Sequence, residues 1–237
     1  MNAVQNENLK QTNEGWWVLT RDTHLSRWIE NHRRLDIAVG ELLPFQKYIP
    51  VGGTVIDVGA SLGDHTMTYA DFVGPTGKVI AFEPNPDSAE CLRRNMAGYP
   101  NVLVVEAGLS DSTGTAWLER DANVGASHLT RATEGSTGDV RTVTLDDFVA
   151  ANPGWFKRLD FVKIDAEGFE PFILDGATKT LARFRPVLML EVNQGQLQKQ
   201  AILTEELLAR LSGAQYKYAA CSGSEGSDQW DALALPR

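Results

Sequence analysis

Carboxylates placed beside glycines and at the ends of apolar runs are the residues of this chain that could do chemistry. Asp57 lies two residues before Gly59 in the stretch TVIDVGASLGDHT, and Gly63 follows four residues later. Glu83 closes a second apolar run, VIAFEP. A carboxylate accepts hydrogen bonds from ammonium and hydroxyl groups, and glycine lets a ligand approach the backbone closely. These residues predict a site for a small ligand that carries such groups.

The charge of these residues discriminates between candidate cofactors. A P-loop needs GxxxxGK[ST], whereas GPTGKV at residues 74–79 is too short and has no hydroxyl after its lysine. A dinucleotide fold needs GxGxxG, and the carboxylate of Asp57 would repel a pyrophosphate there. S-adenosylmethionine carries a sulfonium and an ammonium and has no phosphate. Glu83 could hold both hydroxyls of its ribose, so the residues favour this cofactor.

The segment KIDAEGFE, residues 163–170, holds side chains that could act on a methyl acceptor. An alcohol needs a general base or a metal before it attacks a methyl group. Lys163, Asp165 and Glu167 alternate, so in a continuing strand they face the same way. Our preferred interpretation is that Asp165 and Glu167 border the transferring methyl. The alternative is an ion pair of Lys163 with Asp165 or Glu167 that shapes the loop.

Further side chains could assist this chemistry. Glu191 and Asn193 end the next predicted strand and, with Asp165 and Glu167, offer oxygen ligands suited to Mg²⁺ or Mn²⁺. A metal-free site is preferred, and a metal on Asp165, Glu191 and Asn193 stays an alternative. His128, in the polar stretch NVGASHLT, is the best candidate for a general base because imidazole titrates near neutral pH.

Alternating strands and helices must position these residues. Near-continuous apolar runs, typical of strands buried on both faces, are followed by helical patterns and turns. This alternation predicts an α/β fold with a doubly wound, mostly parallel sheet, whose ligands lie beyond the carboxyl ends of the strands. The sheet strands are predicted within residues 54–60, 79–84, 101–111, 158–168, 185–193, 215–221 and 229–236. Alternating patterns also predict two half-buried strands within residues 114–121 and 140–148.

Two segments outside this alternation are also predicted. Residues 1–49 form an N-terminal extension with helices that pack on the core of a domain spanning 50–237. Within it we expect a frayed end up to about Trp16 and an amphipathic helix over residues 22–36. The polar stretch at residues 121–139 is expected to be a long loop that acts as a lid over the site.

Composition excludes several classes of partner. The 237 residues, 43% of them hydrophobic, suit one large domain. A net charge of −9 repels phosphate backbones, so no nucleic-acid partner is expected. No apolar run approaches the roughly 18–20 residues that cross a bilayer, and no secretory signal is recognisable, so no membrane association is expected. Cys91 and Cys221 are read as free thiols of a cytoplasmic protein, and a homodimer stays open.

Four stretches together carry a family resemblance: VIDVGASLGDHT, VIAFEPNP, VTLDDF and VKIDAEGFEPFILDGA with RPVLMLEVN. Over about residues 50–195 the chain resembles the FkbM family of S-adenosylmethionine-dependent methyltransferases. The resemblance implies the class I methyltransferase fold, a Rossmann-like seven-stranded sheet with helices on both faces and an antiparallel C-terminal hairpin. It also implies O-methylation of a small hydroxylated molecule such as a sugar or polyketide.

The resemblance also implies which residues hold the cofactor. Ser61 stands where family members often have asparagine. Asp165 is expected to touch the cofactor beside the transferring methyl. The remaining expected contacts are Asp57, Gly59, Ala60, Gly63, His65 and Thr66 at the methionine part, Glu83 and Asn85 at the ribose, and Gly108 and Leu109 at the adenine.

Other functions stay open at this point. An RNA or protein methyltransferase is disfavoured by the acidic composition. A nicotinamide oxidoreductase is disfavoured by the missing third glycine. A non-catalytic cofactor-binding module is disfavoured because charged residues are present at three predicted strand ends. The identity of the methyl acceptor has no readable code in the sequence.

Overall fold

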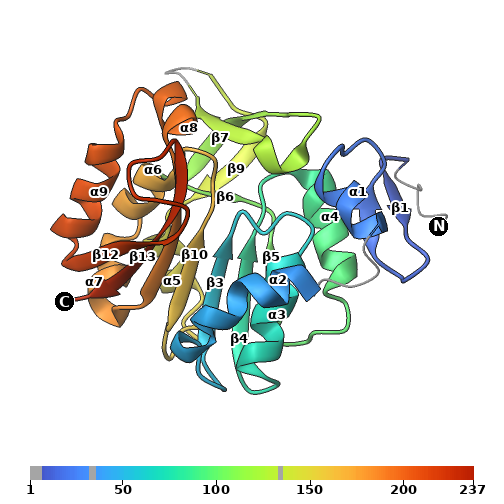
Figure 1. Cartoon of the computed structure of the whole chain (residues 1–237), viewed down its shortest axis with the longest axis horizontal. Helices are drawn as coiled ribbons and strands as arrows, with labels where there is room; N and C mark the ends of the chain where they lie inside the picture. The colour runs from blue at the N-terminus through green and yellow to red at the C-terminus, as the bar shows by residue number, and fades with distance from the viewer. Residues whose placement is uncertain (1–6, 32–35, 133–135) are drawn as a thin grey trace.

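The predicted doubly wound sheet forms the centre of the molecule (Figure 1), in a computed structural model that describes residues 7–31, 36–132 and 136–237. Its strand order is β12-β13-β11-β10-β3-β4-β5. From β11 to β5 neighbours pair in parallel, and β13 pairs antiparallel with both β11 and β12. In the described residues its seven strands are β3 (Thr54–Val58), β4 (Lys78–Phe82), β5 (Val102–Val105), β10 (Phe161–Ile164), β11 (Val187–Asn193), β12 (Tyr216–Ser222) and β13 (Gln229–Pro236).

Helices cover both faces of this sheet, as the apolar strands require. Successive strand residues point to opposite faces, so Val55 and Ile56 belong to different core clusters. One face packs against α2 (Asp36–Leu42), the 3₁₀ helix η1 (Leu43–Tyr48), α3 (Asp64–Val73) and α4 (Pro86–Asn95). The other packs against α5 (Leu145–Ala151), α6 (Glu170–Asp175), α7 (Thr178–Phe184), α8 (Gln194–Lys199) and α9 (Thr204–Gly213).

The N-terminal segment is more ordered than its composition predicts. The expectation of a frayed end up to Trp16 is wrong from Leu9 onward, because β1 (Leu9–Gln11) pairs antiparallel with β2 (Trp17–Leu19). Trp17 also exchanges hydrogen bonds with the side chain of Asn95 on α4, at 2.8 and 3.0 Å. In Figure 1 this hairpin lies beside α4, at the end of the molecule opposite the C-terminal hairpin.

The helix predicted over residues 22–36 is shorter. The structure gives α1 at Leu25–Asn31, a separate α2 from Asp36, and residues 32–35 lie outside the described part. Asp22 explains the later start, because its carboxylate accepts from the backbone N–H groups of Ser26 at 2.6 Å and His24 at 3.1 Å. A carboxylate that caps the first turn marks the beginning of a helix.

The single strand predicted at residues 101–111 is two strands in two sheets. Ala107 N–H donates to the carbonyl of Val105 at 3.0 Å, a tight turn that ends β5. The chain then enters a second, four-stranded sheet of order β6-β9-β7-β8. Its strands are β6 (Gly108–Leu109), β7 (Gly114–Glu119), β8 (His128–Arg131) and β9 (Val140–Val143). Strands β7 and β9 lie where alternating patterns predict strands, whereas β6 and β8 are not predicted as separate strands.

The stretch at residues 121–139 is therefore no structureless loop. It contains the 3₁₀ turn η2 (Val124–Ala126) and strand β8, which pairs antiparallel with β7. Residues 133–135 lie outside the described part. Backbone pairing with β7 fixes residues 128–131, which the expected long loop does not foresee.

Two further expectations concern the molecule as a whole. Cys91 and Cys221 are both free, Cys91 being buried and Cys221 half-buried. No helix in the described ranges is long and apolar enough to cross a membrane.

Candidate active site

A cavity of about 310 Å³ opens at the carboxyl ends of β3, β4 and β10, the edge where a doubly wound sheet binds ligands. The backbone from Gly59 to Ser61 and the side chain of Glu83 form one part of its wall, and Asp165 with Glu167 another. Gly108 and Leu109 of the second sheet complete the opposite end. The cavity thus gathers predicted residues that are far apart in the sequence.

Gly59 occupies a position that no other residue could take. Its φ is +76°, and a Cβ added there would lie 1.8 Å from the carbonyl oxygen of Asp165. Ser61 also has a positive φ of 47°, in the left-handed region where asparagine is several-fold enriched. Two left-handed residues this close turn the chain sharply at the end of β3. The N–H groups of Gly59 and Ala60 both donate to the carbonyl of Phe82 at 3.1 Å, which fixes the turn at the cavity wall.

Four of the residues predicted to bind the cofactor do not line this cavity. They pack or form hydrogen bonds behind its wall. Gly63 lets α3 approach α4, since a Cβ there would lie 2.7 Å from the side chain of Leu92. Asn85 caps α4 by accepting from Asp87 N–H at 3.1 Å. Asp57 and Thr66 are buried and bound to one another, Thr66 Oγ1 donating to Asp57 Oδ2 at 2.6 Å.

Lys163 lies at the cavity wall between the carboxylates of Asp57 and Asp165. It is in register with Asp57 across the β3–β10 pair, and its Nζ donates to Asp165 Oδ2 at 2.9 Å. Burial alone would lower the pKa of Lys163, but the carboxylates of Asp165 and Asp57 outweigh burial and raise this pKa. Burial raises the pKa of Asp57. The ion pair with Asp165, one of the two interpretations of this segment, is therefore present.

Glu83 presents its carboxylate at the edge of the cavity. The residue is 7% exposed, and it accepts hydrogen bonds from the backbone N–H of Ser61 at 2.9 Å and of Asn85 at 2.8 Å. Burial raises its pKa to about 7, despite these two donors. Each carboxylate oxygen keeps a free lone pair for a ligand. The geometry therefore suits a ligand with two neighbouring hydroxyls.

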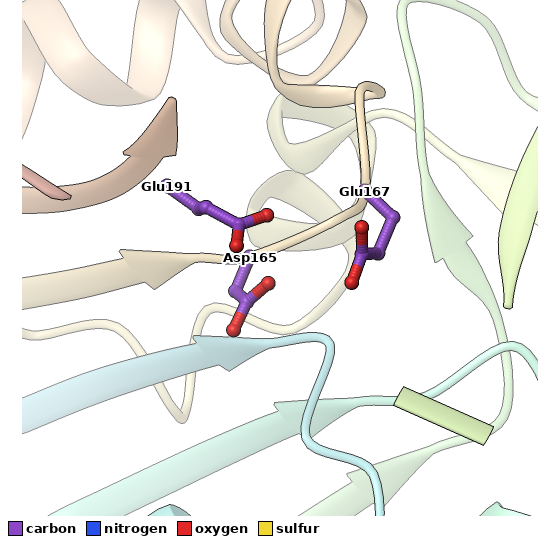
Figure 2. Close-up of side chains that lie close together, drawn as sticks. All are labelled: Asp165, Glu167 and Glu191. Atoms are coloured by element: carbon purple, nitrogen blue, oxygen red, sulfur yellow. The ribbon is translucent and has the colours of Figure 1, made fainter. Parts of the chain in front are cut away.

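Asp165, Glu167 and Glu191 form a cluster, with ligand oxygens within 4.8 Å of one another. Figure 2 shows their carboxylates directed toward a common point from the end of β10, the following loop and β11. The prediction of a continuing strand is wrong, because β10 ends at Ile164 and Glu167 has a φ of 51°. The loop, rather than strand alternation, brings Glu167 beside Asp165.

Burial and, after it, the neighbouring negative charges raise the pKa values of Glu167 and Glu191 in this cluster. Burial, with the charge of Asp165, raises the pKa of Glu167 to about 7. Burial, with the charges of Asp165, Glu167 and Glu170, raises the pKa of Glu191 to about 9. A cation among these oxygens would reverse both shifts, so Asp165, Glu167 and Glu191 could hold a divalent metal. Of the predicted ligands, Asn193 accepts from Gln196 N–H at 3.2 Å instead, as the cap of α8.

Of the two candidate bases His65 and His128, only His65 lines the cavity. His128 is on β8 with Nδ1 3.4 Å from the carbonyl oxygen of Ala126, and it does not line the cavity. His65, in the first turn of α3, does line it. Its Nε2 lies 3.7 Å from a carboxylate oxygen of Glu41. Burial alone would lower the pKa of His65, but Asp64 and Glu41 outweigh burial and raise it.

The N-terminal segment and the stretch that follows β7 also contribute residues to the cavity wall. His24 and Leu25 line the cavity, as do Asn123 and Val124 of the stretch that follows β7. Asp22 connects the two segments, because besides capping α1 its carboxylate accepts from Val124 N–H at 3.2 Å. An acid three residues before an apolar helical repeat is a recognisable capping signal, but its contact with Val124 has no local signature.

Comparison with known proteins places this geometry in a family. A model of the methyltransferase FkbM domain matches residues 57–218. Hexuronic acid methyltransferase AglP of Haloferax volcanii is 31% identical over 140 residues, 59% of this chain and 55% of that protein. Protein-L-isoaspartate O-methyltransferase 1 of Archaeoglobus fulgidus is 38% identical over 56 residues, 23% of this chain and 26% of that protein. The chain thus spans about half the length of AglP and less of the second relative.

Solved structures share the fold at low identity. Methyltransferase FkbM from Methylobacillus flagellatus superposes with a TM-score of 0.52 and 14% identity, covering 88% of this chain and 60% of that one. The O-methyltransferase from Bacillus cereus, in complex with SAH, has a TM-score of 0.50 and 16% identity over 84% of this chain and 80% of that one. The fold is therefore that of the class I methyltransferases, and the chain belongs to the FkbM methyltransferase family.

Proposed function

We propose that this protein transfers the methyl group of S-adenosylmethionine to a hydroxyl of a small molecule. The observation that carries the proposal is the cavity in which the backbone turn at Gly59 faces the buried carboxylate of Glu83. Asp64 and Asp165 also line this cavity, and their carboxylates would repel a pyrophosphate but attract the ammonium and sulfonium groups. The net charge of −9 favours a small acceptor over a nucleic acid.

The order of residues along the cavity supports one orientation of the cofactor. Glu83 would accept from both ribose hydroxyls, and the adenine would lie toward Gly108 and Leu109. The methionine part would then lie along the turn at Gly59 and Ala60, with the sulfonium toward Asp165. S-adenosylmethionine supplies the activated methyl group, and the residues of this chain hold it in place.

Methyl transfer is a single in-line displacement. The bond between the sulfonium sulfur and the methyl carbon breaks, and its electron pair stays on sulfur. The acceptor oxygen forms the new bond to carbon and gives up its hydroxyl proton to a base. We assign that base to His65, because it lines the cavity and Glu41 lies close enough to stabilise the imidazolium. Lys163 donates a hydrogen bond to Asp165 and so holds the Asp165 carboxylate beside the methyl group.

A transfer assay with matched histidine variants tests this assignment. The protein is incubated with S-adenosylmethionine carrying a labelled methyl group and a panel of hydroxylated small molecules, and products are identified by mass spectrometry. We expect His65→Ala to lower kcat about 100-fold and His128→Ala to leave it unchanged. A loss in His128→Ala with full activity in His65→Ala would reverse the assignment. Activity abolished by a chelator would instead indicate a metal on Asp165, Glu167 and Glu191.

A further inference from the structure

A second cavity, of about 600 Å³, meets the first one at three residues. His65, Lys163 and Asp165 line both cavities. The rest of the second cavity is built by α2, β11 and the C-terminal hairpin, with Glu191 and Asp231 among its walls. None of the residues expected to bind adenine or ribose lines it. The second cavity is thus a separate space that opens to the place where the methyl group would lie.

This arrangement is the one that an in-line displacement requires. The attacking oxygen must approach the methyl carbon from the side opposite the sulfur, within van der Waals contact. A cofactor in the first cavity and an acceptor in the second would meet at the shared residues His65, Lys163 and Asp165. His65 would then be in reach of the acceptor hydroxyl. The second cavity is therefore the natural place for the acceptor.

The charges of the second cavity are unbalanced. Its two basic side chains already have acidic neighbours, Lys163 at 2.9 Å from Asp165 and His65 at 3.7 Å from Glu41. Glu191 and Asp231 remain, and they face one another in register across β11 and β13.

Glu191 itself is only half satisfied. One of its oxygens accepts from Gln229 Nε2 at 2.6 Å, and the other is buried with no hydrogen-bond partner among the described residues. Such an oxygen lacks a donor that a ligand could supply.

We propose that the second cavity binds the methyl acceptor, and that this acceptor is a hydroxylated molecule bearing a protonated amine, such as an amino sugar, held at Glu191 and Asp231. The inference rests on the proposed function and names its substrate class. An ammonium there would donate to the unpartnered oxygen of Glu191 and would be attracted by both carboxylates, which lie in register across β11 and β13. A hexuronic acid, the acceptor named for AglP, would add another negative charge instead.

Three sugars of one ring shape test the proposal. Glucosamine, glucose and glucuronate differ in charge and share most hydroxyls. Their binding to the full chain saturated with S-adenosylhomocysteine is measured by NMR titration. We expect glucosamine to bind about tenfold more tightly than glucose, and glucuronate more weakly than glucose. Equal binding of the three, tighter binding of glucuronate, or no binding of any would overturn the proposal.

Matched variants test whether the preference for glucosamine arises at Glu191 and Asp231. Glu191→Gln and Asp231→Asn should each reduce the advantage of glucosamine over glucose, while Glu225→Gln, an exposed acid of the same hairpin, should keep it. An advantage that persists in the first two variants would contradict the site. Binding of S-adenosylhomocysteine shows whether a negative result overturns this inference alone or the proposed function as well. If it binds and no amine preference appears, only this inference fails, whereas if it does not bind, the proposed function fails as well.

Discussion

Glu83 is the residue whose protonation should govern cofactor binding. Only the ionised carboxylate can accept hydrogen bonds from both ribose hydroxyls, and burial raises its pKa to about 7. The affinity for S-adenosylhomocysteine should therefore fall about tenfold between about pH 8 and pH 6. Calorimetric titration across this range measures the change. In Glu83→Gln the pH dependence should be absent, and an unchanged slope in that variant would assign the titration to another group.

Gly59 is the residue at which adding a single methyl group should destabilise the folded protein most. Ala at this position would need a φ of +76° and would place its Cβ 1.8 Å from the Asp165 carbonyl oxygen. We expect Gly59→Ala to lower the free energy of unfolding by about 3 kcal/mol and to abolish cofactor binding. Gly98→Ala is the matched control, because a Cβ at Gly98 meets no atom within 4 Å. Chemical denaturation measures the free energy of unfolding of both variants. Equal stability of the two would contradict the steric requirement for glycine at position 59.

At the scale of elements, Asp22 connects the N-terminal segment to the stretch after β7. Asp22→Ala removes the cap of α1 and the acceptor for Val124 N–H at once. We expect a loss of about 1 kcal/mol in local stability and faster hydrogen exchange at residues 22–31 and 121–127. The cofactor should also dissociate faster, because both segments line its cavity. Unchanged exchange at residues 121–127 would show that the contact does not hold the two segments together.

The sequence predicted the parts of the site that follow from strand ends. Asp57, Glu83 and Asp165 could be placed together because the carboxyl ends of parallel strands meet at one edge of a sheet. Glu167 joins the cluster through a left-handed loop residue that alternation does not foresee. His65 and Glu41 could not be paired, because their contact depends on how α2 docks against α3. Alternation predicts two strands of the second sheet but not their assembly with β6 and β8, since the pairing of β6 with β9 joins segments far apart in the chain.

For the whole molecule, the buried acids predict a dependence of stability on pH. Burial raises the pKa values of Glu83 and Glu170 to about 7, against an unfolded value near 4.5. Between these pH values the native state binds more protons than the unfolded state, so stability falls as pH rises. Each group should lower the free energy of unfolding of the ligand-free protein by about 2 kcal/mol as the pH rises from about 5.5 to about 8. The raised pKa of His65 acts in the same direction.

Denaturant unfolding of the ligand-free protein at several pH values tests this dependence. The free energy of unfolding should be greater at about pH 5.5 than at about pH 8, and Glu170→Gln should reduce the difference. A protein that is more stable at the higher pH would contradict the assignment of these buried acids. Because Glu170 accepts from Ala166 and Gly168 N–H groups in the loop that carries Glu167, the variant also reports on that loop.

The central claim is that the cavity beside Glu83 binds S-adenosylmethionine, and calorimetry at about pH 8 tests it most directly. S-adenosylmethionine and S-adenosylhomocysteine are titrated into the wild-type protein and into Glu83→Gln, with NAD⁺ as the control ligand. We expect a Kd on the order of 1–10 µM for both sulfur compounds, about 100-fold weaker binding in the variant, and no heat from NAD⁺. A folded wild-type protein that binds neither sulfur compound, or that binds NAD⁺ in their place, would contradict it.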